Sequence, residues 1–370
     1  MTHTSCQHII TFAADISESF EHKLNLIHPG DPNSKSKIYL LRQHGDGLKQ
    51  SCKYSMWMDS AVCRDEKCFI VKVQLNWDAL GRYSFFELKK GFELTKLDHK
   101  PFTPQDLNKL QEILLDKTSA LAEVKNTSLV ATKQPSSENK KVDGVSGATV
   151  LSLRNDVIIG AAYTCYDLWH MANGDIVEHI KEISQKTLSN EVVLTFLKSD
   201  DAEKNIFALE CLSKRKIKNA SISKKILRNI EKGKVLTVEP TMSYYAIMST
   251  DKKDLKESML NLFKILNSRQ RLIYLKNILT GSIELDREFY NALCKELPTL
   301  ESYFETQIFF QICSNVKVAE KVLVPHVLKL LSHKKFFIQR RAYQYLILKK
   351  RDKEAEKIIE QFYQKYKSRL

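Results

Sequence analysis

The sequence predicts an α+β protein, with a small antiparallel sheet first and an all-helical region after it. Side chains alternate between apolar and polar from Tyr54 to Val62 and from Phe69 to Trp77, with many β-branched and aromatic residues. This pattern is typical of half-buried strands. Beyond Asn173, apolar residues recur every three or four positions through about a dozen short segments, which indicates amphipathic helices.

Charge also divides the chain, near residue 180. Residues 1–180 hold 21 Lys and Arg against 22 Asp and Glu, whereas residues 181–370 hold 37 against 22. The net charge of +14 therefore comes entirely from the C-terminal half, which carries +15. A basic half favours an acidic protein partner, an anionic membrane surface or nucleic acid. A solvated, Lys-rich helical surface is the plainer alternative.

These patterns divide the chain into three regions. The first lacks clear periodicity and contains the turn-rich piece His28–Asn33, so we expect an extension with some strand. In the second, the turn residues Asp78–Gly81 precede a third strand at Tyr83–Leu88, which completes an antiparallel meander. The regions are residues 1–50 (extension), 51–175 (sheet domain) and 176–370 (basic all-helical domain).

One helix of the sheet domain has strong end signals. Thr103 is a suitable N-cap, Pro104 fits the first helical position, and Asp106 favours the first turn. The predicted apolar face consists of Leu107, Leu110, Ile113 and Leu114. The polar residues 125–141 then predict a surface loop or connection.

The helical region predicts short helices that stack in pairs, as in a HEAT-like solenoid. No exact repeat period can be read from it. The clearest predicted helices are Val192–Leu197, Ile206–Leu212, Leu255–Leu266, Val322–Leu331 and Phe337–Leu348.

The eight cysteines do not form a disulfide framework. Cys63 and Cys68 flank a four-residue connection between two predicted strands, so a hairpin would bring them together, and an oxidising compartment would favour a disulfide. No Cys or His pairs have zinc-like spacing, so we expect no metal site. Four other cysteines lie among apolar residues in helical patterns and are predicted buried thiols: Cys165, Cys211, Cys294 and Cys313.

The N-terminus has a short apolar piece, Ile9–Ala14, without a basic segment before it. We therefore expect no signal peptide in the printed sequence. No stretch approaches the roughly 18 apolar residues of a membrane-spanning helix.

A short motif lies at the end of the sheet domain, at Asp143-Gly144-Val145-Ser146-Gly147-Ala148-Thr149. Gly147 and Ala148 have too little side chain to block backbone N–H groups from a phosphate. A strongly helical run from about Leu151 to Met171 follows, and we expect its N-terminus to point at the same phosphate. The alternative is that Ser146 and Thr149 only cap a turn.

This motif resembles the flavinylation signature of the FMN-binding domain family, which includes the FMN-carrying subunits of Rnf-type and sodium-pumping electron-transport complexes. The signature is Asp, two variable residues, Ser or Thr, Gly, Ala and Thr, and this chain fills every fixed position, with the likeness extending over roughly residues 54–175. The resemblance implies FMN joined through its phosphate to the Thr149 hydroxyl by a flavin transferase. The implied cofactor-binding residues are Asp143, Ser146, Gly147, Ala148 and Thr149.

The resemblance also implies a role and a location. The role is electron transfer rather than chemistry on a substrate of its own, and no residue is assigned a catalytic role. The basic helical domain would dock a redox partner protein or lie on an anionic membrane surface. Members of the family work outside the cytoplasmic membrane, which implies an extracytoplasmic location, whereas the missing signal segment leaves a cytoplasmic location open.

Several residues near the motif have a structural and a flavin-related interpretation. Tyr163, Tyr166 and Trp169 share one side of the predicted helix, and core packing is favoured over stacking on a flavin. His170 is expected to cap the end of this helix rather than donate a proton. Trp77 is expected to anchor a turn. Contacts of Trp77 or Tyr83 with the flavin ring, and of Lys96 or His99 with its polar edge, are the weaker alternatives.

Two other functions fit the sequence. In one, the helical domain is an interaction scaffold and the flavin site is vestigial. In the other, the helical repeat binds nucleic acid through Lys214-Arg215-Lys216-Ile217-Lys218 and through Lys334-Lys335 with Arg340-Arg341. The basic runs contain few aromatic residues apart from Phe336 and Phe337, so nucleic acid is disfavoured.

Overall fold

The computed structural model describes residues 19–29, 35–45, 52–61, 70–96, 100–125, 129–131, 148–149, 153, 155–349 and 352–370. The chain divides into two compact units, Met1–Val192 and Val193–Leu370. The order of elements confirms the predicted α+β layout, with an antiparallel sheet in the first unit and helices through the second.

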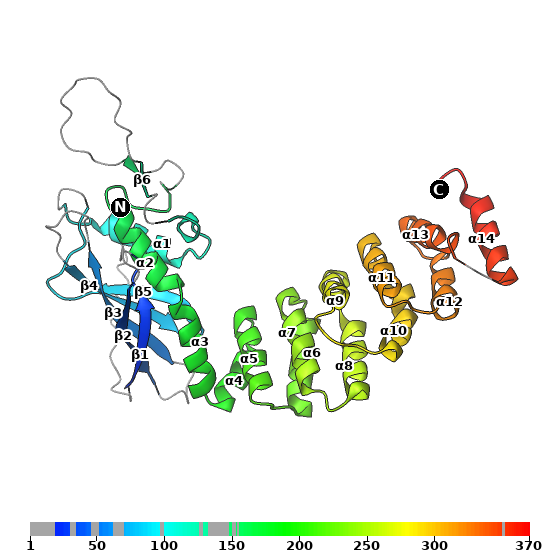
Figure 1. The fold of residues 1–370 in the computed structure, drawn as a ribbon, viewed down its shortest axis with the longest axis horizontal. Helices are drawn as coiled ribbons and strands as arrows, with labels where there is room; N and C mark the ends of the chain where they lie inside the picture. Colours follow the sequence, from blue (N-terminus) through cyan, green and yellow to red (C-terminus); the bar gives the residue numbers. More distant parts are fainter. Residues whose placement is uncertain are drawn as a thin grey trace, which may run out of the picture. The chain divides into compact units, whose positions relative to one another are not determined.

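The first unit contains a five-stranded antiparallel sheet in which strands adjacent in sequence are also adjacent in space (Figure 1). Side chains of β4 alternate strictly between buried and half-buried from Val71 onward, so one face of the sheet faces the core. Tyr54 of β3 lies opposite Trp77 of β4 on this face, and both are buried. The strands are β1 (Ser19–Ile27), β2 (Ser36–His44), β3 (Lys53–Ala61), β4 (Ile70–Asp78) and β5 (Tyr83–Leu88).

Residues 1–50, predicted as an extension with some strand, contain two long strands. β1 and β2 pair with each other along their whole lengths. β2 in turn pairs with β3, for example Leu41 with Met56. Leu26 and Leu41 are buried. These strands therefore belong to the same sheet as the rest of the domain, although their sequences lack the strict alternation that revealed β3 and β4.

Three α-helices complete the first unit: α1 (Pro104–Leu115), α2 (Ala162–Asn173) and α3 (Ile176–Thr187). α1 packs against β5, and α2 packs against β3, α1 and α3. Trp77 Nε1 donates to the Ala172 carbonyl of α2 at 2.8 Å, and the Tyr54 and Ser184 hydroxyls join β3 to α3 at 2.8 Å. These two buried hydrogen bonds fix the helices on the core face of the sheet. The unit division after Val192 accordingly leaves α3 with the sheet, whereas the predicted sheet domain ends at residue 175.

The end signals of α1 are confirmed in detail. Thr103 is the N-cap, Pro104 begins the helix, and Thr103 and Asp106 form a reciprocal capping box. Leu110, Ile113 and Leu114 are buried, as their helical spacing predicts.

The predicted turn after β4 requires its glycine. Asp78 Oδ1 accepts hydrogen bonds from the Leu80 and Arg82 amides, at 2.9 and 3.0 Å. Gly81 has φ of 75°, in the left-handed region, and a Cβ there would lie 2.8 Å from the Val177 carbonyl oxygen of α3. The turn thus determines how closely α3 approaches the sheet.

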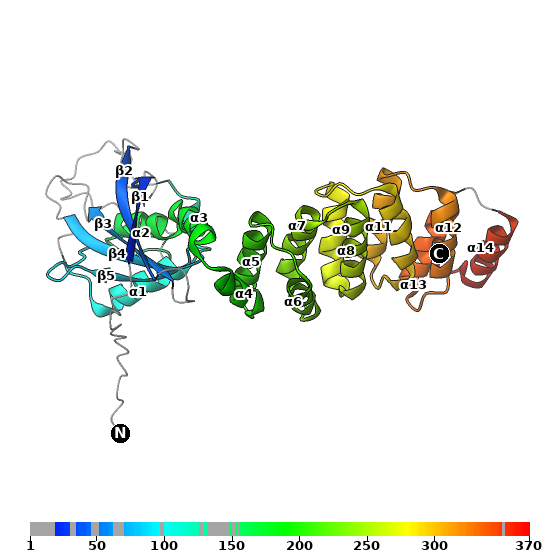
Figure 2. The ribbon, with the colours of Figure 1, turned by 90° about the horizontal axis from the view of Figure 1, so that it is seen from below.

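In the second unit the described residues form α-helices joined by short loops (Figure 2). Polar N-caps begin many of them, including Asp201, Asn219, Asp251 and Ser302, whose side chains accept from the first helical turn. The predicted helices are confirmed to within a few residues. The helices are α4 (Asn190–Lys198), α5 (Ala202–Lys214), α6 (Ala220–Glu231), α7 (Val238–Met248), α8 (Lys252–Ile265), α9 (Ser268–Thr280), α10 (Arg287–Leu293), α11 (Tyr303–Asn315), α12 (Glu320–Leu330), α13 (Phe336–Leu346) and α14 (Lys353–Tyr366), with 3-10 helices η5 (Val235–Thr237) and η6 (Cys294–Thr299).

These helices pack in two alternating layers. α5, α7, α9, α11 and α13 pack successively against one another, and α6, α8, α10 with η6, α12 and α14 form the other series. Each even-numbered helix begins 30 to 35 residues after the previous one, at residues 190, 220, 252, 287, 320 and 353. A pair of helices is therefore the recurring structural unit. No helix among the described residues combines the length and the apolar character that crossing a bilayer requires.

The cysteines of the described residues agree with their predicted burial. Cys165, Cys211, Cys294 and Cys313 are thiols in the core, and Cys52 is also buried. Burial raises the pKa of the Cys165 and Cys211 thiols to about 12. Cys63 and Cys68, and hence their predicted disulfide, lie outside the described residues.

Candidate functional site

The structure describes only the last two residues of the predicted flavinylation motif. Ala148 and Thr149 form the short strand β7, which pairs antiparallel with β6 (Val130–Ala131), so that Thr149 lies opposite Val130. Asp143, Ser146 and Gly147 lie outside the described residues. The last two residues of the motif are therefore paired with β6.

The prediction that a helix follows the motif directly was wrong. α2 begins at Ala162, with Ala161 as an N-cap that has no side-chain hydrogen bond. Before it the chain turns twice, with Asp156 N donating to Leu153 O at 3.0 Å and Ala161 N donating to Ile158 O at 2.9 Å. Gly160 has φ of 84°, which is incompatible with a right-handed helix. The first residue of α2 therefore comes 13 residues after Thr149, whereas the sequence predicted that a helix begins directly after the motif.

The segment after the motif is held firmly against the body of the unit. Asp156 Oδ1 accepts from the Ser119 hydroxyl at 2.7 Å and from the Ala120 amide at 3.1 Å. Leu153 and Val157 are buried, and so is Leu129, just before β6. Thr149 is four residues from Leu153, which limits its Cα to within about 14 Å of that anchor.

Trp77 and Tyr83 are core residues rather than exposed ring contacts. Trp77 is 1% exposed and uses its N–H on Ala172, which confirms its anchoring role. Tyr83 is 6% exposed, its hydroxyl donates to Gln111 Oε1 at 2.7 Å, and burial raises its pKa far above the ordinary value. Neither face is available for stacking on a flavin. Lys96 forms an ion pair with Asp106 at 2.7 Å, and His99 lies outside the described residues.

The aromatic stripe of α2 is largely core packing, as favoured from the sequence. Tyr166 and Trp169 are buried, and Trp169 Nε1 donates to the Asp116 carbonyl at 2.9 Å. His170 lies in the last turn, three residues before the helix ends, and its Nε2 is 3.0 Å from the Leu121 carbonyl oxygen. Burial lowers the pKa of His170. Its imidazole therefore anchors η2 (Ala120–Ala122) rather than capping the end of α2 as a cation.

A cleft of about 220 Å³ opens beside this part of α2. Tyr166 and His170 form one wall, and their ring centroids are 4.2 Å apart. Leu26 and Ile27 at the end of β1 form the opposite side. The lining thus combines apolar and aromatic side chains with polar groups, which include the Asp175 carboxyl.

Asp167 and Thr164 are buried polar residues that the sequence interpretation missed. They are one helical turn apart on α2, at 4% and 0% exposure, and neither Asp167 Oδ1 nor Thr164 Oγ1 has a hydrogen-bond partner in the described part of the chain. Burial raises the pKa of Asp167 to about 7. The available signal was an acidic residue within the mostly apolar run from Ala161 to Met171.

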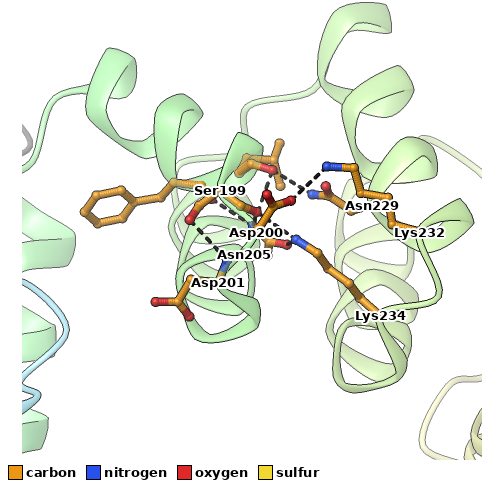
Figure 3. Close-up of polar contacts among 9 residues, drawn as sticks. Ser199, Asp200, Asp201, Asn205, Asn229, Lys232 and Lys234 are labelled. Atoms are coloured by element: carbon orange, nitrogen blue, oxygen red, sulfur yellow. Dashed lines mark hydrogen bonds and ion pairs between the residues drawn. The ribbon is translucent and has the colours of Figure 1, made fainter.

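The second unit has a buried polar cluster at the C-terminus of α4 (Figure 3). Asn205 Nδ2 donates to the Phe196 and Ser199 carbonyls, at 2.8 and 2.9 Å, and Asn229 Nδ2 donates to the Leu197 carbonyl at 2.6 Å. Lys234 Nζ donates to the Ser199 carbonyl at 2.7 Å. A helix end leaves its last carbonyls without intrahelical donors, and these side chains supply them.

The charges in this cluster serve the same structural purpose. Lys234 Nζ also donates to Asn205 Oδ1 at 2.8 Å, and burial lowers the pKa of this lysine although Asp200 opposes the effect. Lys232 binds Asp200 at 2.9 Å on the exposed side. The Lys234 ammonium donates to two protein acceptors, so it is a structural group rather than a reactive amine. The cluster as a whole holds α4, α5 and α6 together.

No group of three or more His, Cys, Asp or Glu side chains that could hold a metal occurs among the described residues. No family model, no curated protein and no solved structure matches the chain.

Proposed function

We propose that this protein is an electron carrier with FMN joined covalently through its phosphate to Thr149. One observation carries the proposal: all five fixed positions of the flavinylation signature are filled, by Asp143, Ser146, Gly147, Ala148 and Thr149. A phosphate tether leaves the ring system free to accept and pass electrons, and it prevents loss of the cofactor.

Two structural features support a cofactor in this unit. The motif leads into a segment anchored by buried Leu153 and Val157, so a group on Thr149 would be held near the body of the unit. The cleft beside Tyr166 and His170 offers aromatic and apolar side chains for a flat ring, together with the polar Asp175. Burial favours the neutral imidazole of His170, so this wall would not present a cation to the ring.

For the second unit we propose a HEAT-like solenoid that docks a redox partner protein. Helix pairs that recur every 30 to 35 residues, in two layers that each pack in sequence, support this class. The net charge of +15 on residues 181–370 favours an acidic partner, and an anionic membrane surface is the alternative. The family resemblance favours an extracytoplasmic location, and maturation would need a flavin transferase.

Covalent loading tests the proposal directly. The chain is co-expressed with a flavin transferase, denatured, and separated from free flavin. We expect flavin fluorescence that stays with the polypeptide, a mass increase of one FMN less one water, and bleaching on chemical reduction. Thr149→Val removes the only proposed attachment atom and should abolish all three signals, whereas the exposed Thr280→Val in the helical unit should retain them.

A wild-type chain that stays colourless under these conditions would overturn the proposal. It would favour the interaction scaffold with a vestigial site. Fluorescence that persists in Thr149→Val would place the flavin elsewhere on the chain.

A further inference from the structure

A groove crosses three consecutive helices of the even-numbered layer in the second unit. It has a volume of about 420 Å³ and is lined by residues of α8, α10 with η6, and α12, including Lys256, Asn291, Lys295, Lys321 and Pro325. Glu288 and Lys321 are each the second residue of their helix, whereas Lys256 is the fifth residue of α8. The groove therefore follows the repeat direction of the helical layer.

The groove has uncompensated positive charge. Lys256 is neutralised by Glu288, with 2.6 Å between Nζ and Oε2. Lys295 and Lys321 are exposed, and neither forms an ion pair with a carboxylate in the described ranges of the chain. Two cations that line one groove attract an anionic group more strongly than scattered surface lysines do, because their fields add there.

Other polar groups in the groove also favour an anion. α12 begins at Glu320 after Ala319, which provides no side-chain cap, and its first turn contributes Lys321 and Val322 to the lining. The first N–H groups of a helix carry partial positive charge. His326 also lines the groove, and burial and the nearby Lys329 and Lys295 lower its pKa, so its neutral ring adds no positive charge.

We propose that this groove binds an acidic peptide segment of a protein partner, whose carboxylates pair with Lys295 and Lys321. Ala292, Val322 and Pro325 add apolar surface to the same lining, which suits the side chains of a peptide. Among the described residues, His326 is the one aromatic ring that lines this groove, so a nucleic-acid strand would find little base stacking there. The groove lies wholly in the second unit, so this proposal is independent of the flavin.

The test uses the full-length chain and a fluorescein-labelled peptide of ten glutamates as the probe, followed by fluorescence anisotropy at low salt. We expect saturable binding that weakens as salt rises. Lys295→Glu with Lys321→Glu should weaken binding at least about tenfold, because each reversal replaces an attraction by a repulsion. The matched control, Lys276→Glu with Lys357→Glu, changes net charge equally at exposed positions of α9 and α14 outside the groove, and we expect less than about a threefold effect.

Far-ultraviolet circular dichroism and thermal melting verify that both double variants keep their helices. Equal weakening in the two variants would overturn the proposal, since it would show attraction by net charge alone. Absence of binding by wild type would also overturn it. A single-stranded oligonucleotide of matched charge is the competitor, and tighter binding of this oligonucleotide through Lys295 and Lys321 would replace the acidic peptide by nucleic acid.

Discussion

Replacing Asp167 by Asn should change how the free energy of unfolding of the first unit depends on pH, and by more than a replacement at the surface would. Asp167 is 4% exposed, and its Oδ1 has no partner among the described residues. Burial raises the pKa of Asp167 from an ordinary 3.8 to about 7. Between about pH 4 and 7 the folded state thus keeps a proton that the unfolded state has lost. The free energy of unfolding therefore falls as pH rises through this window and is level above it.

The size of the effect follows from the two pKa values. A rise from 3.8 to about 7 corresponds to an upper bound of roughly 4 kcal/mol, at about 1.4 kcal/mol per pKa unit. Asn has nearly the same shape and cannot ionise. We expect the Asn variant to match wild type near pH 4 and to be more stable by about 2 to 4 kcal/mol at pH 8.

Tryptophan fluorescence during urea unfolding measures this unit selectively. The three tryptophans, Trp57, Trp77 and Trp169, all belong to the first unit. Burial also lowers the pKa of His44 and His170, which makes stability fall toward acid pH, but both histidines remain in the variant and their effect cancels in the difference. Asp175→Asn, which removes one carboxyl at an exposed residue of the same unit, is the matched control.

A difference between Asp167→Asn and wild type that stays within about 0.5 kcal/mol across this range would refute the reasoning. It would mean that the carboxyl is solvated, or that a partner stabilises its charge in solution.

Two further predictions concern stability. Gly81→Ala should destabilise the first unit by at least about 2 kcal/mol, because φ is 75° and the new Cβ would lie 2.8 Å from the Val177 carbonyl oxygen. Tryptophan fluorescence measures the loss. The control is Gly91→Ala, where nothing lies within 4 Å of the added Cβ, so the difference between the two variants is the steric part of the cost. Asn229→Ala should destabilise the second unit by about 1 to 3 kcal/mol, because the Leu197 carbonyl loses its shorter buried hydrogen bond and keeps only the one of 3.4 Å from Asn205 Nδ2. Circular dichroism measures the loss, and a loss no larger than that of exposed Asn315→Ala would contradict the prediction.

Much of the fold could be predicted from local patterns. The alternation in β3 and β4 and the cap of α1 at Thr103 reveal those elements because burial and end effects act on neighbouring residues. β1 and β2 escaped this approach because each combines exposed apolar residues, such as Ile27 and Ile38, with few buried ones. Their place in the sheet depends on pairing between distant segments, which no local pattern encodes.

The candidate site was less predictable than the fold. The sequence predicts one helix from about Leu151 to Met171. In the structure the chain turns at Asp156 and Gly160 adopts φ of 84°, so α2 begins only at Ala162. A glycine in an apolar run is compatible with helix, so its left-handed conformation could not be inferred locally. The role of Asp156 in holding Ser119 likewise requires residues 37 positions apart to meet.

By itself, the sequence determined the order of sheet and helices, the basic character of the C-terminal half, and Thr149 as the proposed flavin attachment residue. These depend on residue types and short spacings. Only the tertiary structure decided that Trp77 and Tyr83 are core residues, that Asp167 is buried with no partner for Oδ1 among the described residues, and that Lys295 and Lys321 line one groove. Burial and the sharing of a groove are properties of surfaces brought together by packing, and a side chain's chemistry changes with the dielectric and the neighbours that packing provides.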